Sequence, residues 1–156
     1  MDWNFRKSFF IFVRKIIAIG LNEQIMRKFK TQNGFVNNKI MVEKKLILDG
    51  NAYSFFVPDD EVIIELRYDP DQASRLILLN ASSELKSKIQ LSDVYYIIEW
   101  KFTVEDVENN HASDWQVLDY LKRKSEENKL ELSNQDFDEI IHLENLYYKL
   151  IGIIPD

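Results

Sequence analysis

Three residues of this chain have the types and the order that metal-dependent hydrolysis requires. Asp71 follows a proline, and Glu99 and Lys101 stand one residue apart further along. Two carboxylates can hold a divalent cation, and a lysine can position the attacking water. Alternating apolar residues predict a strand over residues 94–102, on which Glu99 and Lys101 would share one face. The sequence therefore contains one candidate catalytic trio.

This trio resembles the motif of the PD-(D/E)xK nucleases, and such a nuclease is the first alternative function. The pattern also arises by chance, because glutamate is followed two residues later by lysine at four positions of this highly charged chain. The ordinary interpretation places Glu99 and Lys101 on the solvent side of a half-buried antiparallel strand. Acidic charge also opposes a nucleic-acid substrate, since neutralisation of phosphates supplies most of the affinity. We therefore expect a protein without catalytic residues.

Other catalytic and cofactor motifs are absent from the sequence. The chain has no cysteine, which excludes a thiolate nucleophile, a disulfide and cysteine-ligated metals. It has neither a G-x-S-x-G nucleophile elbow nor a glycine-rich phosphate loop. His111 and His142 each follow a glutamate by three residues, but only the second falls in a predicted helix. We predict no bound cofactor and no metal.

Charge is distributed very unevenly along the chain. Residues 1–50 carry ten Lys/Arg and four Asp/Glu, whereas residues 51–156 carry ten and twenty-two. The second part therefore has a net charge of −12 within a total of −6. A field of this sign attracts cationic partners and repels nucleic acid and anionic lipid. We expect a basic protein as the partner and no nucleic acid.

The carboxylates expected to meet this partner occur in three clusters of the acidic part. A small inhibitor benefits from such clusters because charge complementarity speeds association and can carry large coupling energies. Part of the acidity has an ordinary explanation, since Asp136 and Asp138 fall in the first turn of a predicted helix, where negative charge is favourable. The predicted partner-binding residues are Asp59, Asp60, Glu61, Glu105, Asp106, Glu108, Asp136, Asp138 and Glu139.

A basic amphipathic helix is predicted over residues 4–19. Six apolar residues from Phe5 to Ile19 fall on one face at about 100° per residue, whereas Lys7 and Lys15 project from the other. Packing of this helix onto a sheet is the ordinary interpretation. The second alternative function is an adaptor that docks through it on anionic membrane or RNA. No apolar run approaches the roughly 18 residues of a spanning helix, so no membrane span is expected.

The remaining periodicity predicts an α+β fold in a single domain, residues 1–156. Asp49-Gly50 predicts a two-residue hairpin turn, and Ser113 and Ser133 predict the N-caps of two C-terminal helices. About five strands are expected between the N-terminal helix and these two helices, paired mostly antiparallel. Their predicted ranges are 40–48, 53–57, 62–68, 76–79 and 94–102.

These observations favour a non-catalytic binding protein with an acidic surface. Its most specific form is a bacterial immunity (antitoxin) protein that neutralises a basic toxin domain. Isoleucine, lysine and asparagine are abundant and alanine is scarce, as expected from an AT-rich bacterial gene. We expect a cytoplasmic location, because the chain has no cysteine and the apolar run near its start is too short for a signal peptide.

Overall fold

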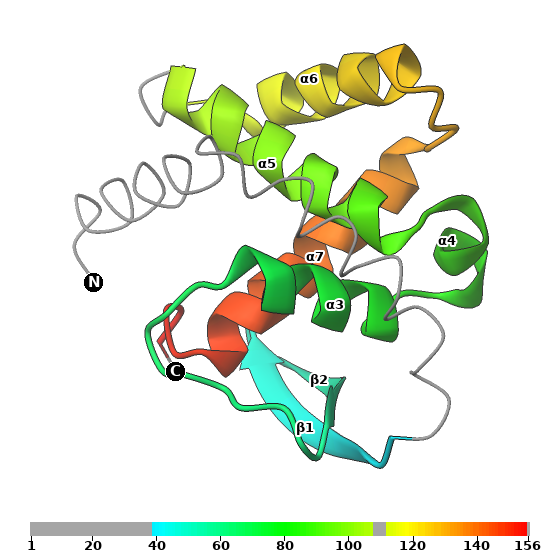
Figure 1. Ribbon diagram of the computed structural model, residues 1–156. Coiled ribbons are helices and arrows are strands. Elements are labelled where there is room, and N and C mark those ends of the chain that lie inside the picture. Colours follow the sequence, from blue (N-terminus) through cyan, green and yellow to red (C-terminus); the bar gives the residue numbers. More distant parts are fainter. Residues whose placement is uncertain (1–38, 108–111, 156) are drawn as a thin grey trace.

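The computed structural model describes residues 39–107 and 112–155, which form a β-hairpin and a group of helices (Figure 1). In Figure 1 the hairpin lies at the bottom, followed upward by two helices that cross above it and then by two more toward the top. The elements in chain order are β1 (Met41–Leu48), β2 (Asn51–Pro58), α3 (Pro70–Asn80), α4 (Ser83–Lys88), α5 (Leu91–Val107), α6 (Asp114–Glu127) and α7 (Asn134–Leu150).

The hairpin forms where the sequence predicts it. β1 and β2 pair antiparallel, and Leu48 and Asn51 face each other on either side of the turn. Asp49 and Gly50 both have positive φ, 50° and 77°. This is the geometry of a type I′ turn, whose twist matches that of the two strands it joins. The predicted hairpin turn is confirmed.

The predicted five-stranded sheet is wrong. The described residues contain one sheet, and it has two strands. Residues 62–68 form an irregular loop, residues 76–79 belong to α3, and residues 94–102 belong to α5. The loop of residues 59–69 that joins β2 to the next helix is called the β2–α3 loop below. The described part of the fold is therefore a helical cluster with one hairpin against it.

α5 is helical because its buried residues follow a helical period. Leu91, Val94, Tyr95, Ile98 and Phe102 are all buried, with spacings of three and four residues. The helix packs against α3 on one side and α6 on another. Because α5 is buried on several sides, its sequence lacks the polar stripe that marks a surface helix. Its β-branched and aromatic residues therefore gave a sequence pattern typical of a strand. Intrinsic β-propensity yields here to packing.

α3 begins at the segment that the sequence marks as a turn. The side chain of Asp69 accepts hydrogen bonds from the backbone N–H of Asp71 at 2.9 Å and of Gln72 at 3.2 Å. Pro70 occupies the first helical position, where its missing N–H costs nothing. The aspartate and the proline are therefore a helix start, and the apolar residues that follow them are buried on one helix rather than on a strand.

The two C-terminal helices begin at the predicted caps. Ser113 precedes α6 and Ser133 precedes α7, and each closes a capping box with the residue three positions later. These two predictions are confirmed. The buried side chains of the helices and the hairpin form one hydrophobic cluster.

Two predictions concern parts of the chain that are not described. The predicted N-terminal helix, residues 4–19, lies outside the described residues, and the assignment of residues 1–156 to a single domain stays a prediction. Within residues 39–107 and 112–155, no helix combines the length and the apolar character needed to cross a membrane.

Candidate functional site

The β2–α3 loop carries three large apolar side chains that face solvent. Val62, Ile64 and Leu66 are 75%, 49% and 51% exposed. Among the described residues, every other exposed large apolar side chain except Trp115 lies on the hairpin or just before it. Concentration of such side chains at one end of a molecule is typical of an interaction surface.

The backbone of this loop is fixed at both ends of its apolar stretch. The Gln72 side chain donates to the carbonyl of Val62 at 2.8 Å, and the N–H of Leu66 donates to the carbonyl of Ile151 at 2.7 Å. Ile63 points the other way and packs against the core. The loop is therefore held by α3 and by the end of α7 while three apolar side chains remain outside.

Glu61 is the main polar anchor of the loop. Its Oε1 accepts a hydrogen bond from Gln72 Nε2 at 2.8 Å and an ion-pair contact from Arg75 Nη2 at 2.7 Å. The hydroxyl of Tyr147 in turn donates to Gln72 Oε1 at 3.0 Å. A continuous chain of polar contacts thus ties the loop to α3 and α7. The carboxylate of Glu61 therefore binds side chains of its own chain.

Leu66 stands in a backbone conformation that suits glycine. Its φ is +58°, in the left-handed region, which costs a residue with a Cβ roughly 1–2 kcal/mol. The side chain lies over Gly152, where an added Cβ would stand 3.8 Å from Leu66 Cδ2. Strained residues of this kind cluster at binding and switch regions. The strain here sits in the middle of the exposed apolar stretch.

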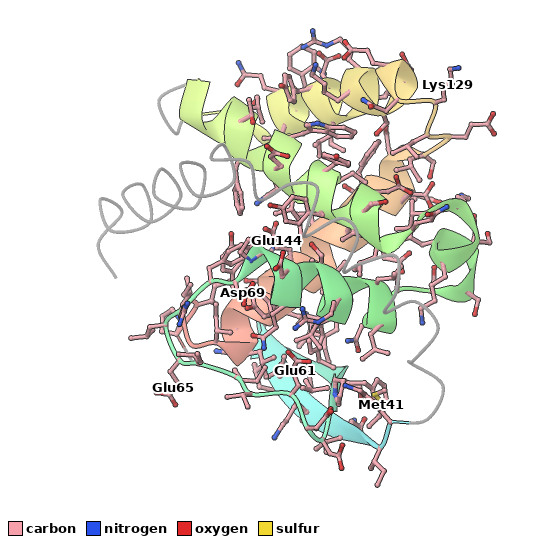
Figure 2. All side chains as sticks on the ribbon, in the orientation of Figure 1. Met41, Glu61, Glu65, Asp69, Lys129 and Glu144 are labelled. Atoms are coloured by element: carbon pink, nitrogen blue, oxygen red, sulfur yellow. The ribbon has the colours of Figure 1, made fainter. Side chains whose placement is uncertain are left out.

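A buried polar centre lies directly behind the loop. Glu144 on α7 is 1% exposed, and its Oε2 forms an ion pair with Lys101 Nζ of α5 at 2.8 Å. Its Oε1 accepts hydrogen bonds from the hydroxyls of Tyr68 at 2.9 Å and Tyr148 at 3.4 Å. Figure 2 shows Glu144 among the helices and Glu65 at the outer edge of the loop. Because Tyr68 belongs to the loop, this centre joins the loop to α5 and α7.

Burial changes the acidity of the tyrosines around this centre. Burial raises the pKa of Tyr68 well above its usual value, and the negative charge of Glu144 raises it further. Burial is also the largest cause that raises the pKa of Tyr95 and of Tyr147. These phenols keep their protons in the folded protein at pH values where an exposed tyrosine loses its own.

The free energy of unfolding is expected to fall as pH rises above about 10, the ordinary pKa of tyrosine. The unfolded chain then loses phenolic protons that the folded chain retains, so each step in pH favours unfolding. Urea unfolding between pH 8 and pH 11 measures this slope. Tyr68→Phe should make the slope shallower than in the wild type. A flat profile above pH 10 would contradict the assignment.

Two of the three predicted partner-binding carboxylates at residues 59–61 form ion pairs within the chain. Asp60 forms an ion pair with Lys39 at 2.9 Å, and the hydrogen bond from this lysine lowers the pKa of Asp60. Glu61 is bound by Arg75, as described above. Asp59 remains exposed at the start of the loop. One carboxylate of the three is thus available without breaking an internal ion pair.

Asp136 has a structural role at the start of α7. It is nearly buried, accepts a hydrogen bond from the backbone N–H of Ser133 at 2.7 Å, and forms an ion pair with Lys88 at 3.0 Å. Burial alone would raise the pKa of Asp136, but the hydrogen bonds from Ser133 and Lys88 outweigh it and lower the pKa. Asp136 therefore caps the helix.

The other members of the predicted clusters are placed as follows. Glu139 accepts hydrogen bonds from the backbone N–H of Ser82 at 2.6 Å and from its hydroxyl at 3.0 Å, so it helps to start α4. Asp138 is exposed. The side chains that lie outside the described residues are those of Glu105, Asp106 and Glu108.

The strand on which the predicted catalytic trio depended is replaced by a helix, and the catalytic role of the three residues stays a prediction. Glu99 and Lys101 lie on α5, where residues two positions apart point about 200° apart around the helix axis. Lys101 contacts Glu144, while Asp71 and Glu99 both lie close enough to Tyr95 to raise its pKa further. No three His, Cys, Asp or Glu side chains of the described residues gather as metal ligands. The shared strand face on which the trio depended is absent.

The sequence carried a signal for Glu144 but none for the exposed loop. Glu144 stands on the same helix face as Ile140, Tyr147 and Ile151, at spacings of −4, +3 and +7 residues, which marks it as a buried acid. The alternation of residues 62–68 instead predicted inward-facing apolar side chains.

The chain was compared with protein-family models, curated proteins and solved structures. No protein-family model matches the chain, and neither the curated proteins nor the solved structures contain a significant match.

Proposed function

We propose that this chain is a non-catalytic binding protein that attaches to a basic partner protein through the β2–α3 loop. The observation that carries this proposal is the outward position of Val62, Ile64 and Leu66 on a backbone fixed at both ends. Interface energy is concentrated in a few desolvated apolar side chains surrounded by polar residues. The loop offers such a group.

The fixed backbone favours binding because less order has to be created on association. Ordering a flexible loop at an interface costs conformational entropy on binding. A loop that is already ordered in the folded protein avoids this cost. Glu61 and Gln72 hold one end of the apolar stretch, and the contact of Leu66 with Ile151 holds the other. The side chain of Leu66, whose φ is positive, is exposed like those of Val62 and Ile64.

Negative charge near the loop supports a basic partner. Asp59 and Glu65 are exposed on the loop, and the chain carries a net charge of −6. Such charges at the rim of an interface mainly increase the association rate. Asp60, Glu61 and Asp136 are paired inside the molecule, so apolar contact provides most of the affinity and charge provides steering.

Inhibition of a cationic toxin domain, as by a bacterial immunity protein, is the specific form of this function. An acidic protein with a preformed apolar loop suits the task, because a basic active site can be covered without any chemistry by the inhibitor. The measurement for this form is growth of cells that produce the chain together with a toxin domain, should one be encoded beside its gene, and protection of growth is the expected result. Equal growth arrest with and without the chain would contradict it.

Site-specific photocrosslinking in the source cell tests the binding surface. A benzophenone amino acid at Ile64 is expected to crosslink to one basic protein, because this side chain is exposed in the middle of the loop. The same amino acid at Lys122, exposed on α6, is the matched control and should not capture that protein. Capture from both positions alike, or from neither, would contradict the proposal.

With the captured partner purified, substitutions in the loop separate apolar contact from steering. Val62→Ser, Ile64→Ser and Leu66→Ser together are expected to weaken binding by about a hundredfold or more, since a hot-spot residue contributes about 2 kcal/mol or more. Asp59→Lys with Glu65→Lys should slow association and leave dissociation nearly unchanged. Surface plasmon resonance at two salt concentrations measures both effects.

A further inference from the structure

We infer that the free edge of β1 pairs with the same edge of a second copy of this chain, forming an antiparallel dimer centred on Lys44. This inference is independent of the proposed partner surface, because it uses the edge of the hairpin and not the β2–α3 loop. Within the described residues, the sheet consists of β1 and β2 alone, and no backbone partner lies along the outer edge of β1. An open edge of this kind is a template for another strand.

The contacts of Asn80 show which backbone groups of the hairpin point outward. The N–H of Phe56 donates to Asn80 Oδ1 at 2.6 Å, and Asn80 Nδ2 donates to the carbonyl of Phe56 at 2.8 Å. Both backbone groups of Phe56 therefore point away from β1. Its partner across the ladder is Glu43, which must also point its backbone groups away from β2. By alternation, the outward residues of β1 are Met41, Glu43, Lys45 and Ile47.

Asn80 makes the two edges of the sheet unequal. Its side-chain amide occupies the donor and acceptor in the middle of the β2 edge, as a third strand would. α3, which carries Asn80, packs beside β2. The β1 edge has no such cover among the described residues. A second copy is therefore expected on β1.

The sequence of β1 is complementary to itself when two copies pair around Lys44. In this register Glu43 lies opposite the second copy's Lys45, and Lys45 lies opposite the second copy's Glu43. Within one copy, Lys45 Nζ already contacts Glu43 Oε1 at 2.7 Å, and both contact the hydroxyl of Ser54. Pairing completes a square in which each charge has opposite charges as its nearest neighbours. Opposite charges directly across a ladder stabilise it.

The apolar residues of β1 also gain partners in this register. On the outer face, Met41 lies opposite Ile47 of the second copy, and Ile47 is 51% exposed in the single chain. On the inner face, Val42, which is 38% exposed, lies opposite Leu46 of the second copy. Apolar cross-strand pairs add to the stability of a ladder. Each of these exposed side chains is covered by the dimer.

Neighbouring registers lack this complementarity. A shift by two residues in one direction places Glu43 opposite Glu43, and a shift in the other direction places Lys45 opposite Lys45. Like charges directly opposite each other destabilise a ladder. A shift by one residue pairs outward groups with inward groups and removes the hydrogen bonds. The charge pattern therefore selects one register.

One contact in the dimer is unfavourable and gives a specific test. Lys44 lies opposite Lys44 of the second copy at the two-fold axis, so two ammonium groups face each other on the inner face of the sheet. Lys44→Thr is expected to tighten the dimer, because it removes this repulsion and adds a β-branched residue. The substitution leaves the outer-face square unchanged.

Sedimentation velocity over a range of concentrations of the full chain tests the dimer. The wild type is expected to dimerise reversibly. Glu43→Lys should raise the dissociation constant about tenfold or more, because two attractive pairs become repulsive. The double variant Glu43→Lys, Lys45→Glu exchanges the charges and should restore dimerisation. A wild type that stays monomeric would overturn the inference. The same holds if the β1 edge pairs only with strands of other proteins.

Controls separate loss of pairing from loss of folding and from the partner surface. Circular dichroism and thermal unfolding should show that the Glu43 and Lys45 variants keep the wild-type fold. Glu65→Lys makes the same charge change on the β2–α3 loop and should leave the dimer unaffected. Equal weakening by Glu65→Lys and Glu43→Lys, or failure of the double variant to recover dimerisation, would also overturn the inference. Partner binding through the loop would remain testable in either case.

Discussion

Replacing Glu144 with alanine is expected to lower the free energy of unfolding by about 3–5 kcal/mol, the usual cost of removing one partner of a buried ion pair. The carboxylate is almost fully buried and lies 2.8 Å from the ammonium group of Lys101. It also accepts hydrogen bonds from the hydroxyls of Tyr68 and Tyr148. Its removal therefore takes away the opposite charge of one group and the acceptor of two others. Urea denaturation at pH 7 measures the loss.

Two further variants identify the cause of this loss. Replacement of both charges, by Lys101→Met with Glu144→Leu, should recover a large part of the stability, since apolar residues of similar size often substitute for a buried ion pair. Glu126→Ala, an exposed acid on α6, should change the stability by no more than about 0.5 kcal/mol. A cost of Glu144→Ala as small as that of Glu126→Ala would show that the polar centre contributes little.

The second large effect is expected at Gln72, which links the β2–α3 loop to the helices. Its side chain donates to Glu61 and to the Val62 carbonyl and accepts from Tyr147. Gln72→Leu keeps the volume but removes every one of these hydrogen bonds. A loss of about 2–3 kcal/mol is expected, because buried groups lose their partners. Partner binding should also weaken although no exposed side chain has changed.

Hydrogen exchange locates the effect of this substitution. The amide of Leu66 donates to Ile151 and should exchange more slowly than free amides in the wild type and faster in Gln72→Leu. Gln135→Leu, an exposed glutamine on α7, is the matched control and should leave that amide and the stability unchanged. Unchanged exchange at Leu66 in Gln72→Leu would mean that the loop does not depend on this anchor.

Local chemistry made the hairpin and the helix starts predictable. Asp49-Gly50 adopts positive φ at both positions, which few other residue pairs do readily. Ser113 and Ser133 each supply a side-chain oxygen to the first turn of a helix. The hairpin turn and the helix caps each depend on residues only a few positions apart in the chain. They can therefore be predicted from a single sequence.

The helical state of α5 was not predictable by the same means. Its Val, Ile, Tyr, Trp and Phe side chains favour a strand intrinsically, and the helical state depends on α3 and α6 packing around it. Likewise, the alternation of residues 62–68 resembles a strand, but no neighbouring strand is present to receive it in the described sheet. Tertiary contacts decide both cases.

The candidate site could be predicted only in part, because counter-charges come from remote positions. The sequence identifies the acidic residues, but it does not show that Asp136 meets Lys88 from α4 or that Glu144 meets Lys101 from α5. Such contacts turn apparent partner-binding carboxylates into internal anchors. Exposure of apolar side chains in the β2–α3 loop likewise depends on which way the anchored backbone turns.

The side-chain amide of Asn80 has a consequence beyond the stability of β2. A chain with two open sheet edges can join copies head to tail, and such contacts build fibres without limit. In the inferred dimer, Asn80 covers the middle of the β2 edge and the second copy covers the β1 edge, so a third copy has no equivalent edge to join. If the chain dimerises through β1 as inferred, Asn80 limits polymerisation in a protein that exposes apolar side chains on both strands of its hairpin.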